Sequence, residues 1–284
     1  MNPQDFEVSG PMNGVAELSY IAVHPIKALD PLSLSKVGFS AAGGLTDDRA
    51  YAIVDEDGTY INGKRTAAVH PIRATYDSEK GTVHLELDES ATVDPPGERV
   101  DAEEFYPDDE RAELESWLST YFGISITLKS GDGGSQTDGA VYGDSSKAGP
   151  TVVSEATLGA VGSWYGLSGE EMRRRMRPNL VVSGVPAFWE DRLVDGQRVR
   201  IGDITLEGEK VLPRCVVPKR DSQTGAETPG FQQRFVTQRE ATLPEWTDVD
   251  RFDGNLYRLA ARLRVPENER NADIRVGDEV SLVE

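Results

Sequence analysis

Cysteine is almost absent from the sequence, because Cys215 is the only one in 284 residues. One thiol excludes an internal disulfide and a cysteine-rich metal site, and it fits a reducing compartment. Three interpretations of Cys215 remain open: a small core residue, a nucleophile, or a single thiolate ligand to a metal carried by a cofactor. Composition alone favours the core. The setting favours the thiolate, because Arg214 precedes the cysteine and Lys219 and Arg220 follow it.

Positive charge is also scarce, with 30 Lys and Arg against 49 Asp and Glu and a net charge of −19. Such a chain has no dominant basic face, so nucleic acid is excluded as a partner. Abundant carboxylates with few lysines are typical of proteins from a high-salt cytoplasm, where salt screens the self-repulsion. The composition therefore predicts an acidic, halophilic protein.

Long apolar runs are missing as well. No stretch of 18 apolar residues occurs, so we expect no membrane span. Residues 1–13 are polar and acidic, which argues against a signal peptide, and we expect a cytoplasmic protein. A chain of 31.0 kDa nevertheless has ample material for one large or two modest domains.

Short strand-like runs fill residues 16–87 and predict a small barrel or sandwich. The sequence Asp55-Glu56-Asp57-Gly58 indicates a hairpin turn. Apolar spacing over 110–122 predicts an amphipathic helix. A Gly/Ser/Asp-rich loop over 131–149 follows, and it lacks the spacing of a nucleotide phosphate loop.

The second half alternates helices and strands. Ser154 is a helix N-cap candidate, and Ser168 with Glu171 reads as a capping box. Residues 180–183, 199–201, 204–211, 256–263 and 276–283 have the composition of strands, and residues 230–241 are compatible with a helix.

Several basic residues stand out against the acidic background. Lys27 and Arg49 lie at strand ends, where each is either a solvated loop charge or a ligand to an anion. Four arginines fall within residues 173–177. They are either favourable charges at a helix C-terminus or a phosphate or pterin site, where arginine offers bidentate donors.

Taken together in order, these segments resemble the MOSC family, in which an N-terminal MOSC β-barrel domain precedes the MOSC domain. The resemblance extends from about residue 15 to the end of the chain. The matching stretches are His24-Pro25-Ile26-Lys27, residues 44–51, residues 153–158, residues 177–184, Trp189-Glu190-Asp191, Pro213-Arg214-Cys215 with Asp221 and Thr224-Gly225, and residues 274–278.

The resemblance implies a mainly β fold with flanking helices (α+β), in which a small N-terminal β-barrel or sandwich packs on a C-terminal MOSC β-barrel. The expected ranges are 15–100 for the N-terminal domain, 101–150 for a helix and connecting loop, and 151–284 for the cofactor-binding MOSC domain.

The resemblance also implies a molybdenum cofactor (a molybdopterin with a phosphate) held between the domains. Cys215 matches the position whose thiolate ligates the metal. Positions matching cofactor contacts are Lys27, Arg49, Ser145, Ser146, Arg177, Asn179, Pro213, Arg214 and Asn255. No other cysteine exists for an iron–sulfur cluster, and no desulfurase domain precedes residue 15, so neither that cluster nor pyridoxal phosphate is expected.

Similar proteins include bacterial molybdenum-dependent reductases of N-hydroxylated compounds and the mitochondrial amidoxime-reducing component. The leading expectation is a reductase of small N-oxygenated substrates that takes electrons from a separate ferredoxin- or flavoprotein-like donor. Two alternatives remain: a sulfur or cofactor carrier that forms a persulfide on Cys215, and a non-catalytic binding protein. The departures from the family pattern are Ala28, where a serine is frequent, and the absence of a second cysteine before Arg214. Glu190, Asp191 and Asp221 are unranked candidates for a catalytic acid.

Overall fold

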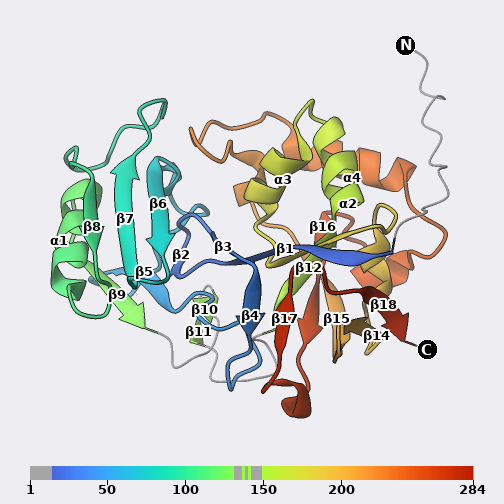
Figure 1. The fold of residues 1–284 in the computed structure, drawn as a ribbon. Helices are drawn as coiled ribbons and strands as arrows, with labels where there is room; N and C mark the ends of the chain where they lie inside the picture. The colour runs from blue at the N-terminus through green and yellow to red at the C-terminus, as the bar shows by residue number, and fades with distance from the viewer. Residues whose placement is uncertain (1–14, 131–135, 138–139, 142–148, 284) are drawn as a thin grey trace.

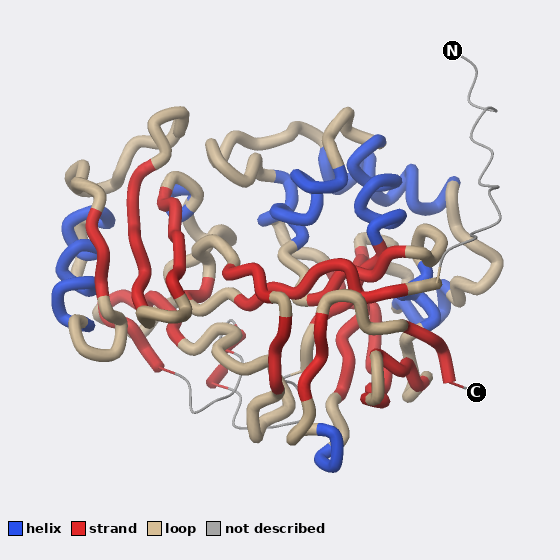
Figure 2. The backbone as a smooth tube through the Cα atoms, in the orientation of Figure 1, coloured by secondary structure: helices blue, strands red, loops and turns tan. Residues whose placement is uncertain are grey.

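The computed structural model describes residues 15–130, 136–137, 140–141 and 149–283. A smaller unit containing helix α1 lies beside a larger unit that carries helices α2, α3 and α4 (Figure 1). Strands make up the centre of both units, and helices lie on their outer faces (Figure 2). This arrangement confirms the expected mainly β fold with flanking helices. No helix in the described ranges is both long and apolar enough to cross a membrane.

Two three-stranded sheets and helix α1 (Arg111–Phe122) enclose the core of the smaller unit. The strand orders are β2-β5-β9 and β6-β7-β8. In β5, Ile53 faces this core while Ala52 and Val54 pack on Tyr60, as the two-residue repeat of a strand requires. The bounds are β2 (Ile26–Lys27), β5 (Tyr51–Asp55), η1 (Ala67–Val69), β6 (Ile72–Asp77), β7 (Thr82–Leu87), β8 (Glu103–Phe105) and β9 (Ile126–Ser130).

Two local expectations in this unit are confirmed. The predicted helix is α1, which ends at Gly123 with a φ of 66°, a left-handed conformation that glycine adopts without strain. The predicted turn forms after Asp55, whose carbonyl accepts a hydrogen bond from Gly58 N at 2.9 Å. The chain then makes a single bridge between Val54 and Tyr60 rather than a second full strand.

The larger unit is built on an eight-stranded sheet in the order β18-β14-β15-β16-β12-β13-β1-β3. The sheet curls until the start of β1 meets the start of β18. There, Leu18 N donates to Asp278 O at 2.8 Å and Val280 N donates to Ala16 O at 2.7 Å. Closure of this kind removes an exposed sheet edge and forms the expected barrel. The bounds are β1 (Glu17–Val23), β3 (Leu32–Leu34), β12 (Thr151–Ser154), β13 (Leu180–Ser183), β14 (Arg198–Ile201), β15 (Ile204–Pro213), β16 (Arg258–Arg264) and β18 (Val280–Val283).

The beginning of the chain is shared between the two units. Strand β1 lies within the range expected for the first domain, yet it pairs with β13 of the second. Likewise β4 (Lys36–Gly38) pairs with β17 (Asp273–Arg275). Helix α1 and β9, from the range expected for a connection, pack in the core of the smaller unit. A further short pair is β10 (Gln136–Thr137) with β11 (Ala140–Val141).

Alternating side chains divide the larger unit into a barrel core and a helix-covered face. Val152 and Leu180 point into the barrel, whereas Val153 and Val181 pack beneath the helices. The predicted caps are confirmed, because Ser154 Oγ accepts from Thr157 N and Ser168 Oγ accepts from Glu171 N, both at 3.0 Å. The bounds are α2 (Glu155–Ser163), α3 (Gly169–Met176), η3 (Trp189–Arg192), η4 (Val217–Lys219), α4 (Phe231–Ala241), η5 (Val249–Phe252) and η6 (Glu267–Glu269).

Candidate functional site

A pocket of about 480 Å³ lies between the two units. Its walls come from the chain between β1 and β3, the turn before β5, the segment 62–73, the end of α3 and the segment 217–223. Among the described residues that line it, Asp30 is the single carboxylate. The nine lysine and arginine side chains that line it are Lys27, Arg49, Lys64, Arg73, Arg173, Arg174, Arg175, Arg177 and Arg220.

This gathering of positive charge contradicts the character of the protein as a whole, which has a net charge of −19. Like charges placed around one concave surface repel each other, and low-dielectric walls focus their field into the pocket. A small anion is the ligand that such an arrangement favours. The predicted residues Lys27, Arg49 and Arg177, which are far apart in the sequence, are brought together here.

One wall of the pocket is a buried histidine–aspartate–arginine group. Asp48 accepts a hydrogen bond from His24 N at 2.9 Å, lies 3.5 Å from His24 Nδ1, and forms an ion pair with Arg49. Burial by itself would raise the pKa of Asp48, but Arg49 and His24 outweigh it and hold this pKa below its ordinary range. Burial, reinforced by Arg177, lowers the pKa of His24 to about 3. His24 is therefore neutral at pH 7, and Arg49 is held in place by a charged partner.

Arg177 ends helix α3 in a left-handed conformation with a φ of 54°. Its backbone N donates to Arg173 O at 2.8 Å, and its Nη2 donates to Leu29 O at 2.5 Å. Burial and the nearby Arg49 lower the pKa of Arg177 to about 10, so it stays charged at pH 7 at a cost that an anion would offset.

The other arginines of the run 173–177 have different roles. The Arg173 guanidinium lies 4.0 Å from the centre of the Tyr20 ring, and Arg174 pairs with Glu170 at 2.6 Å on the helix surface. Arg175 is buried and pairs with Glu171 at 2.6 Å and Asp221 at 3.1 Å. Ion pairs with carboxylates therefore account for part of the run, and Arg177 is a partly buried cation of the pocket lining.

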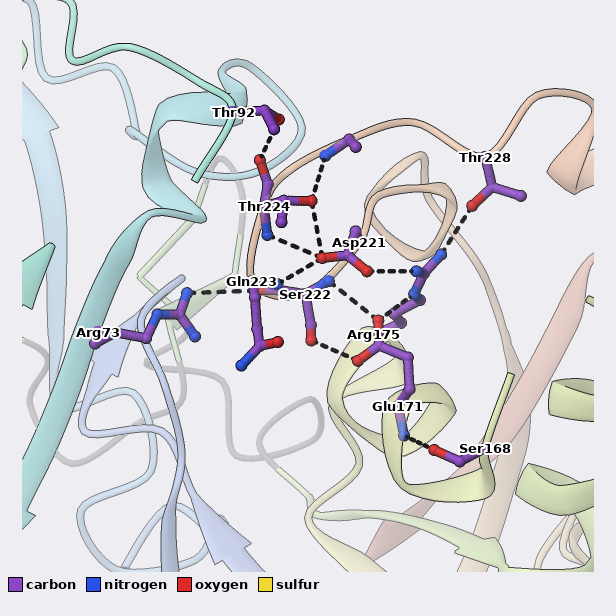
Figure 3. A network of polar contacts seen from close by, with 11 residues as sticks. Arg73, Thr92, Ser168, Glu171, Arg175, Asp221, Ser222, Gln223, Thr224 and Thr228 are labelled. Atoms are coloured by element: carbon purple, nitrogen blue, oxygen red, sulfur yellow. Dashed lines mark hydrogen bonds and ion pairs between the residues drawn. The ribbon is translucent and has the colours of Figure 1, made fainter. Parts of the chain in front are cut away.

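Figure 3 shows that Glu171, Arg175, Asp221 and Ser222 form one network that holds the loop 221–225. Ser222 donates from Oγ at 2.6 Å and from N at 3.1 Å to the Glu171 carboxylate. The capping-box prediction is thus only half correct, because the Glu171 side chain binds Arg175 and Ser222 rather than returning to the helix start. Asp221, a candidate acid, accepts from Thr224 N and Oγ1, both at 2.9 Å.

The loop also contacts the smaller unit (Figure 3). Arg73 Nη2 donates to Ser222 O and Thr92 Oγ1 donates to Thr224 O, both at 3.3 Å. Gly225, at a φ of 73°, is so close to η1 that an added Cβ would lie 3.3 Å from Ala67 O. These contacts fix the width of the pocket, since they join its two walls.

Cys215 is half-buried and free, and it follows the last residues of β15. It does not line the pocket, but Val217, two residues further on, does. Tyr257 Oη donates to Cys215 O at 3.1 Å. Arg214 donates to Met176 O at 2.5 Å, which ties the residue before the cysteine to the residue before Arg177. Burial lowers the pKa of Arg214, and Cys215 and Tyr257 act in the opposite direction.

Three further predicted residues lie outside the pocket lining. Asn179 is buried between strands: its Oδ1 accepts from Thr151 N at 3.1 Å and its Nδ2 donates to Ala22 O at 3.1 Å. Pro213 and Asn255 are exposed, and Asn255 Oδ1 accepts from Tyr257 N at 2.9 Å. Asn179 acts through the backbone of β1, whose Ala22 does line the pocket. Ser145 and Ser146 lie outside the described residues.

Glu190 and Asp191 are also away from the pocket, in a buried polar group beneath α4. Glu190 Oε2 accepts from Thr157 Oγ1 at 3.0 Å, and Asp191 forms an ion pair with the fully buried Arg239. Burial, together with the neighbouring Asp191, raises the pKa of Glu190 to about 8. Residues 189–191 lie in a buried 3-10 helix, in which Arg239 neutralises Asp191 and Thr247 Oγ1 donates a hydrogen bond to the same carboxylate.

Among the lining residues that sequence reasoning missed are His70 and Arg73, and it noted Arg220 only as a neighbour of the cysteine. No local pattern connects Arg73 with Arg220, because 147 residues separate them. The usable signal was scarcity: the chain has 3 histidines, and both His24 and His70 precede proline and line the pocket.

The donors around the pocket fit an oxyanion. Among the buried nitrogens without a hydrogen-bond partner in the described part of the chain are Nε of Arg73, Nε of Arg220 and Nε2 of His70 in the pocket lining, and Nε of Arg214 outside it. A buried donor without an acceptor destabilises the folded state, and phosphate oxygens would supply acceptors. No cluster of three or more His, Cys, Asp or Glu side chains in the described ranges fits a metal ion. A metal would therefore need most of its ligands from a cofactor, with Cys215 as the thiolate.

Comparison with known proteins agrees with the order of these segments. No curated protein matches the chain. Among solved structures it is similar to the crystal structure of the YuaD protein from Bacillus subtilis, with 11% sequence identity, a TM-score of 0.39 and coverage of 94% of each chain. The family model of the MOSC N-terminal beta barrel domain matches residues 15–125, and that of the MOSC domain matches residues 151–281. The chain therefore belongs to the MOSC domain family.

Proposed function

We propose that this protein is a molybdenum-cofactor-dependent reductase of small N-oxygenated compounds. MOSC domains are known to bind the molybdenum cofactor. The observation that carries the proposal is the pocket between the units, which gathers nine basic side chains on a protein of net charge −19 beside its only cysteine segment. When bound, the cofactor supplies a metal centre that accepts an oxygen atom from the substrate.

The residues of the chain would hold and orient this group. Arg49 and Arg177 bind its phosphate, because both are partly buried and already fixed by Asp48 and Leu29. The Cys215 thiolate ligates the metal. His24 is neutral at pH 7 and adds no positive charge to the site. Its backbone N–H donates to Asp48 at 2.9 Å and so positions that carboxylate and, through it, Arg49.

The reaction needs an external supply of electrons. An amidoxime takes up two electrons and two protons and gives an amidine and water. A ferredoxin- or flavoprotein-like partner would supply the electrons one or two at a time.

The test is the molybdenum and pterin content of the protein from a host that makes the cofactor. Wild type should carry both. Cys215→Ser should lose metal, and Arg177→Met should lose pterin and metal together. Arg200→Met is the control, since Arg200 is exposed on β14 outside the pocket lining. Full metal content and activity in Cys215→Ser would overturn the proposal.

One alternative has an observation in its favour: the Cys215 thiol is half-buried and is not part of the pocket lining. In a sulfur carrier the thiolate would attack the outer sulfur of a donor persulfide, so that Cys215 becomes the persulfide and the donor leaves as a thiol. Mass spectrometry that finds a persulfide on Cys215 in protein lacking molybdenum would favour the carrier and count against the reductase.

A further inference from the structure

The pocket has two basic ends, and the two histidines distinguish them. Besides burial, the cations that lower the pKa of His24 are Arg177 and Arg49. Those that lower the pKa of His70, to about 4, are Arg220, Arg177 and Arg73. Arg177 acts on both histidines, whereas Arg49 acts on His24 and Arg73 and Arg220 act on His70, which divides the basic lining into an Arg49 end and an Arg220 end.

The second end is assembled from both units. His70 follows η1 and Arg73 lies in β6, whereas Arg220 follows η4 of the larger unit. An added Cβ on Gly63 would lie 3.2 Å from His70 Nε2 and 3.2 Å from Val217 Cγ2. The imidazole therefore lies beside the segment that leads to Arg220.

Both guanidinium groups at this end are fixed by bonds to some of their nitrogens. Arg73 donates to Asp30 at 3.2 Å, to Ser222 O at 3.3 Å and to His70 O. Arg220 donates to Gly225 O at 3.2 Å and pairs with Glu227 at 2.9 Å.

Two guanidinium donors and one imidazole nitrogen at this end are buried and remain without a partner in the described ranges. Nε of Arg73, Nε of Arg220 and Nε2 of His70 have no hydrogen-bond partner among the described residues. Asp88 lies 3.9 Å from Arg73 Nε, which is too far for a hydrogen bond. Donors held rigidly in advance bind an oxyanion without an ordering cost.

We propose that His70, Arg73 and Arg220 form a second anion subsite, which binds a carboxylate or phosphate carried by the substrate. That the bound anion is a substrate rests on the proposed reductase function, whereas anion binding at this end does not. With one end of the pocket taken by the cofactor phosphate, the other end selects acidic N-oxygenated compounds over neutral ones of the same size. The same oxyanion chemistry would also suit the cofactor phosphate, so the test must separate the two sources.

The first measurement is turnover by the holoenzyme with dithionite-reduced viologen as electron source. The substrates are benzamidoxime, which is neutral, and 4-carboxybenzamidoxime, which is anionic. Wild type should prefer the acid in kcat/KM by about tenfold or more. Arg220→Met should lower kcat/KM for the acid by about ten- to one-hundred-fold and should change kcat/KM for the neutral substrate far less.

The second measurement does not depend on activity. Calorimetry with the inert 4-carboxybenzamide should show binding to wild type that is lost in Arg220→Met and kept in Arg200→Met, with benzamide as the neutral probe. Such binding supports the subsite even in a protein without reductase activity. Equal binding of both probes by wild type, or an equal fall in kcat/KM for both substrates in Arg220→Met, would overturn it. Loss of pterin in Arg220→Met would also overturn it and assign this end to the cofactor.

The fold of the variant is checked by its melting temperature. Arg220→Lys provides a second variant that keeps the charge. It should retain part of the preference for the acid, because lysine binds carboxylates as a point charge without the fixed fork of arginine. The proposal would be contradicted if Arg220→Lys lowered kcat/KM for the neutral substrate as strongly as kcat/KM for the acid.

Discussion

The Arg177 guanidinium donates to the carbonyl of Leu29 at 2.5 Å and so joins the end of helix α3 to the chain after β2. The bond spans 148 residues and connects the two sides of the basic pocket. It uses one nitrogen of the arginine fork and leaves the rest of the group for the pocket. An arginine is thereby both a tie between the units and a donor to an anion.

Replacement of Arg177 by lysine should separate these two roles. Lysine keeps the charge but lacks the rigid fork of separate nitrogens, so it cannot hold Leu29 O and a phosphate in the two fixed directions that arginine offers. We expect pterin retention after desalting to fall about tenfold, and the free energy of unfolding to fall by about 1 kcal/mol. Pterin fluorescence and urea unfolding measure the two effects. Arg264→Lys is the matched control, because Arg264 is exposed and pairs with Glu207 on the surface. Unchanged pterin retention would refute the assigned role.

Two adjacent glutamates of α3 provide a matched pair for the loop network. Glu171 pairs with the buried Arg175 and accepts two hydrogen bonds from Ser222, whereas Glu170 pairs with Arg174 in solvent. Glu171→Gln should lower the free energy of unfolding by about 1–2 kcal/mol, because Arg175 loses one of two charged partners. Glu170→Gln should change it by less than about 0.5 kcal/mol. Urea unfolding at pH 7 measures both, and equal effects would contradict this account of the network.

Glu190 should make stability fall as the pH rises from 6.5 to 8. Burial, with a smaller effect of Asp191, raises the pKa of folded Glu190 to about 8, while the unfolded chain releases this proton near its ordinary pKa of 4.5. The folded state therefore binds more protons in this interval, and its stabilisation is lost as the pH approaches 8.

Wild type should lose about 1–2 kcal/mol of unfolding free energy between pH 6.5 and 8 from this group. Glu190→Gln, which resembles the protonated acid, should lack that loss. Glu155→Gln is the control, since Glu155 is exposed in the first turn of α2. Urea unfolding at three pH values checks the slope, and the same slope in wild type and Glu190→Gln would count against the prediction.

The acidic composition predicts that salt stabilises the fold. At a net charge of −19 the folded chain repels itself, and 2 M KCl screens that repulsion almost completely compared with 0.1 M. We expect the melting temperature to rise by several degrees over this range. Sucrose at equal osmolality separates screening from solvent exclusion, because it carries no charge. A melting temperature independent of salt would remove the basis for a halophilic origin.

Much of the local structure was predictable because its causes are local. Ser154 and Ser168 cap helices as expected, since a hydroxyl at that position accepts from the third backbone N–H whatever surrounds it. The apolar spacing of residues 110–122 produced α1 in the same way. Capping by Glu171 was not predictable in full, because a carboxylate that meets a buried Arg175 and a loop hydroxyl binds them instead.

The pocket could be predicted only in part. The isolated basic residues Lys27, Arg49 and Arg177 were visible against an acidic background, so one end of the site followed from charge and family resemblance. His70 shares with His24 only its rarity and a following proline, and nothing in the sequence near Arg73 distinguishes it from an ordinary surface residue. Their role depends on the loop 221–225, which folds back across the boundary between the units.

The sequence by itself determined most of the strands, the helix caps, the acidic composition and the uniqueness of Cys215, because each depends on neighbours in the chain or on composition. The strand expected over 276–283 was only partly right, since β18 begins at Val280 and residues 276–277 form a turn before it. Only the tertiary structure decided that β1 completes the barrel of the other unit and that Arg73 and Arg220 share one pocket. Whether two residues 147 positions apart line one pocket depends on how packed layers meet, and short-range patterns do not encode that geometry.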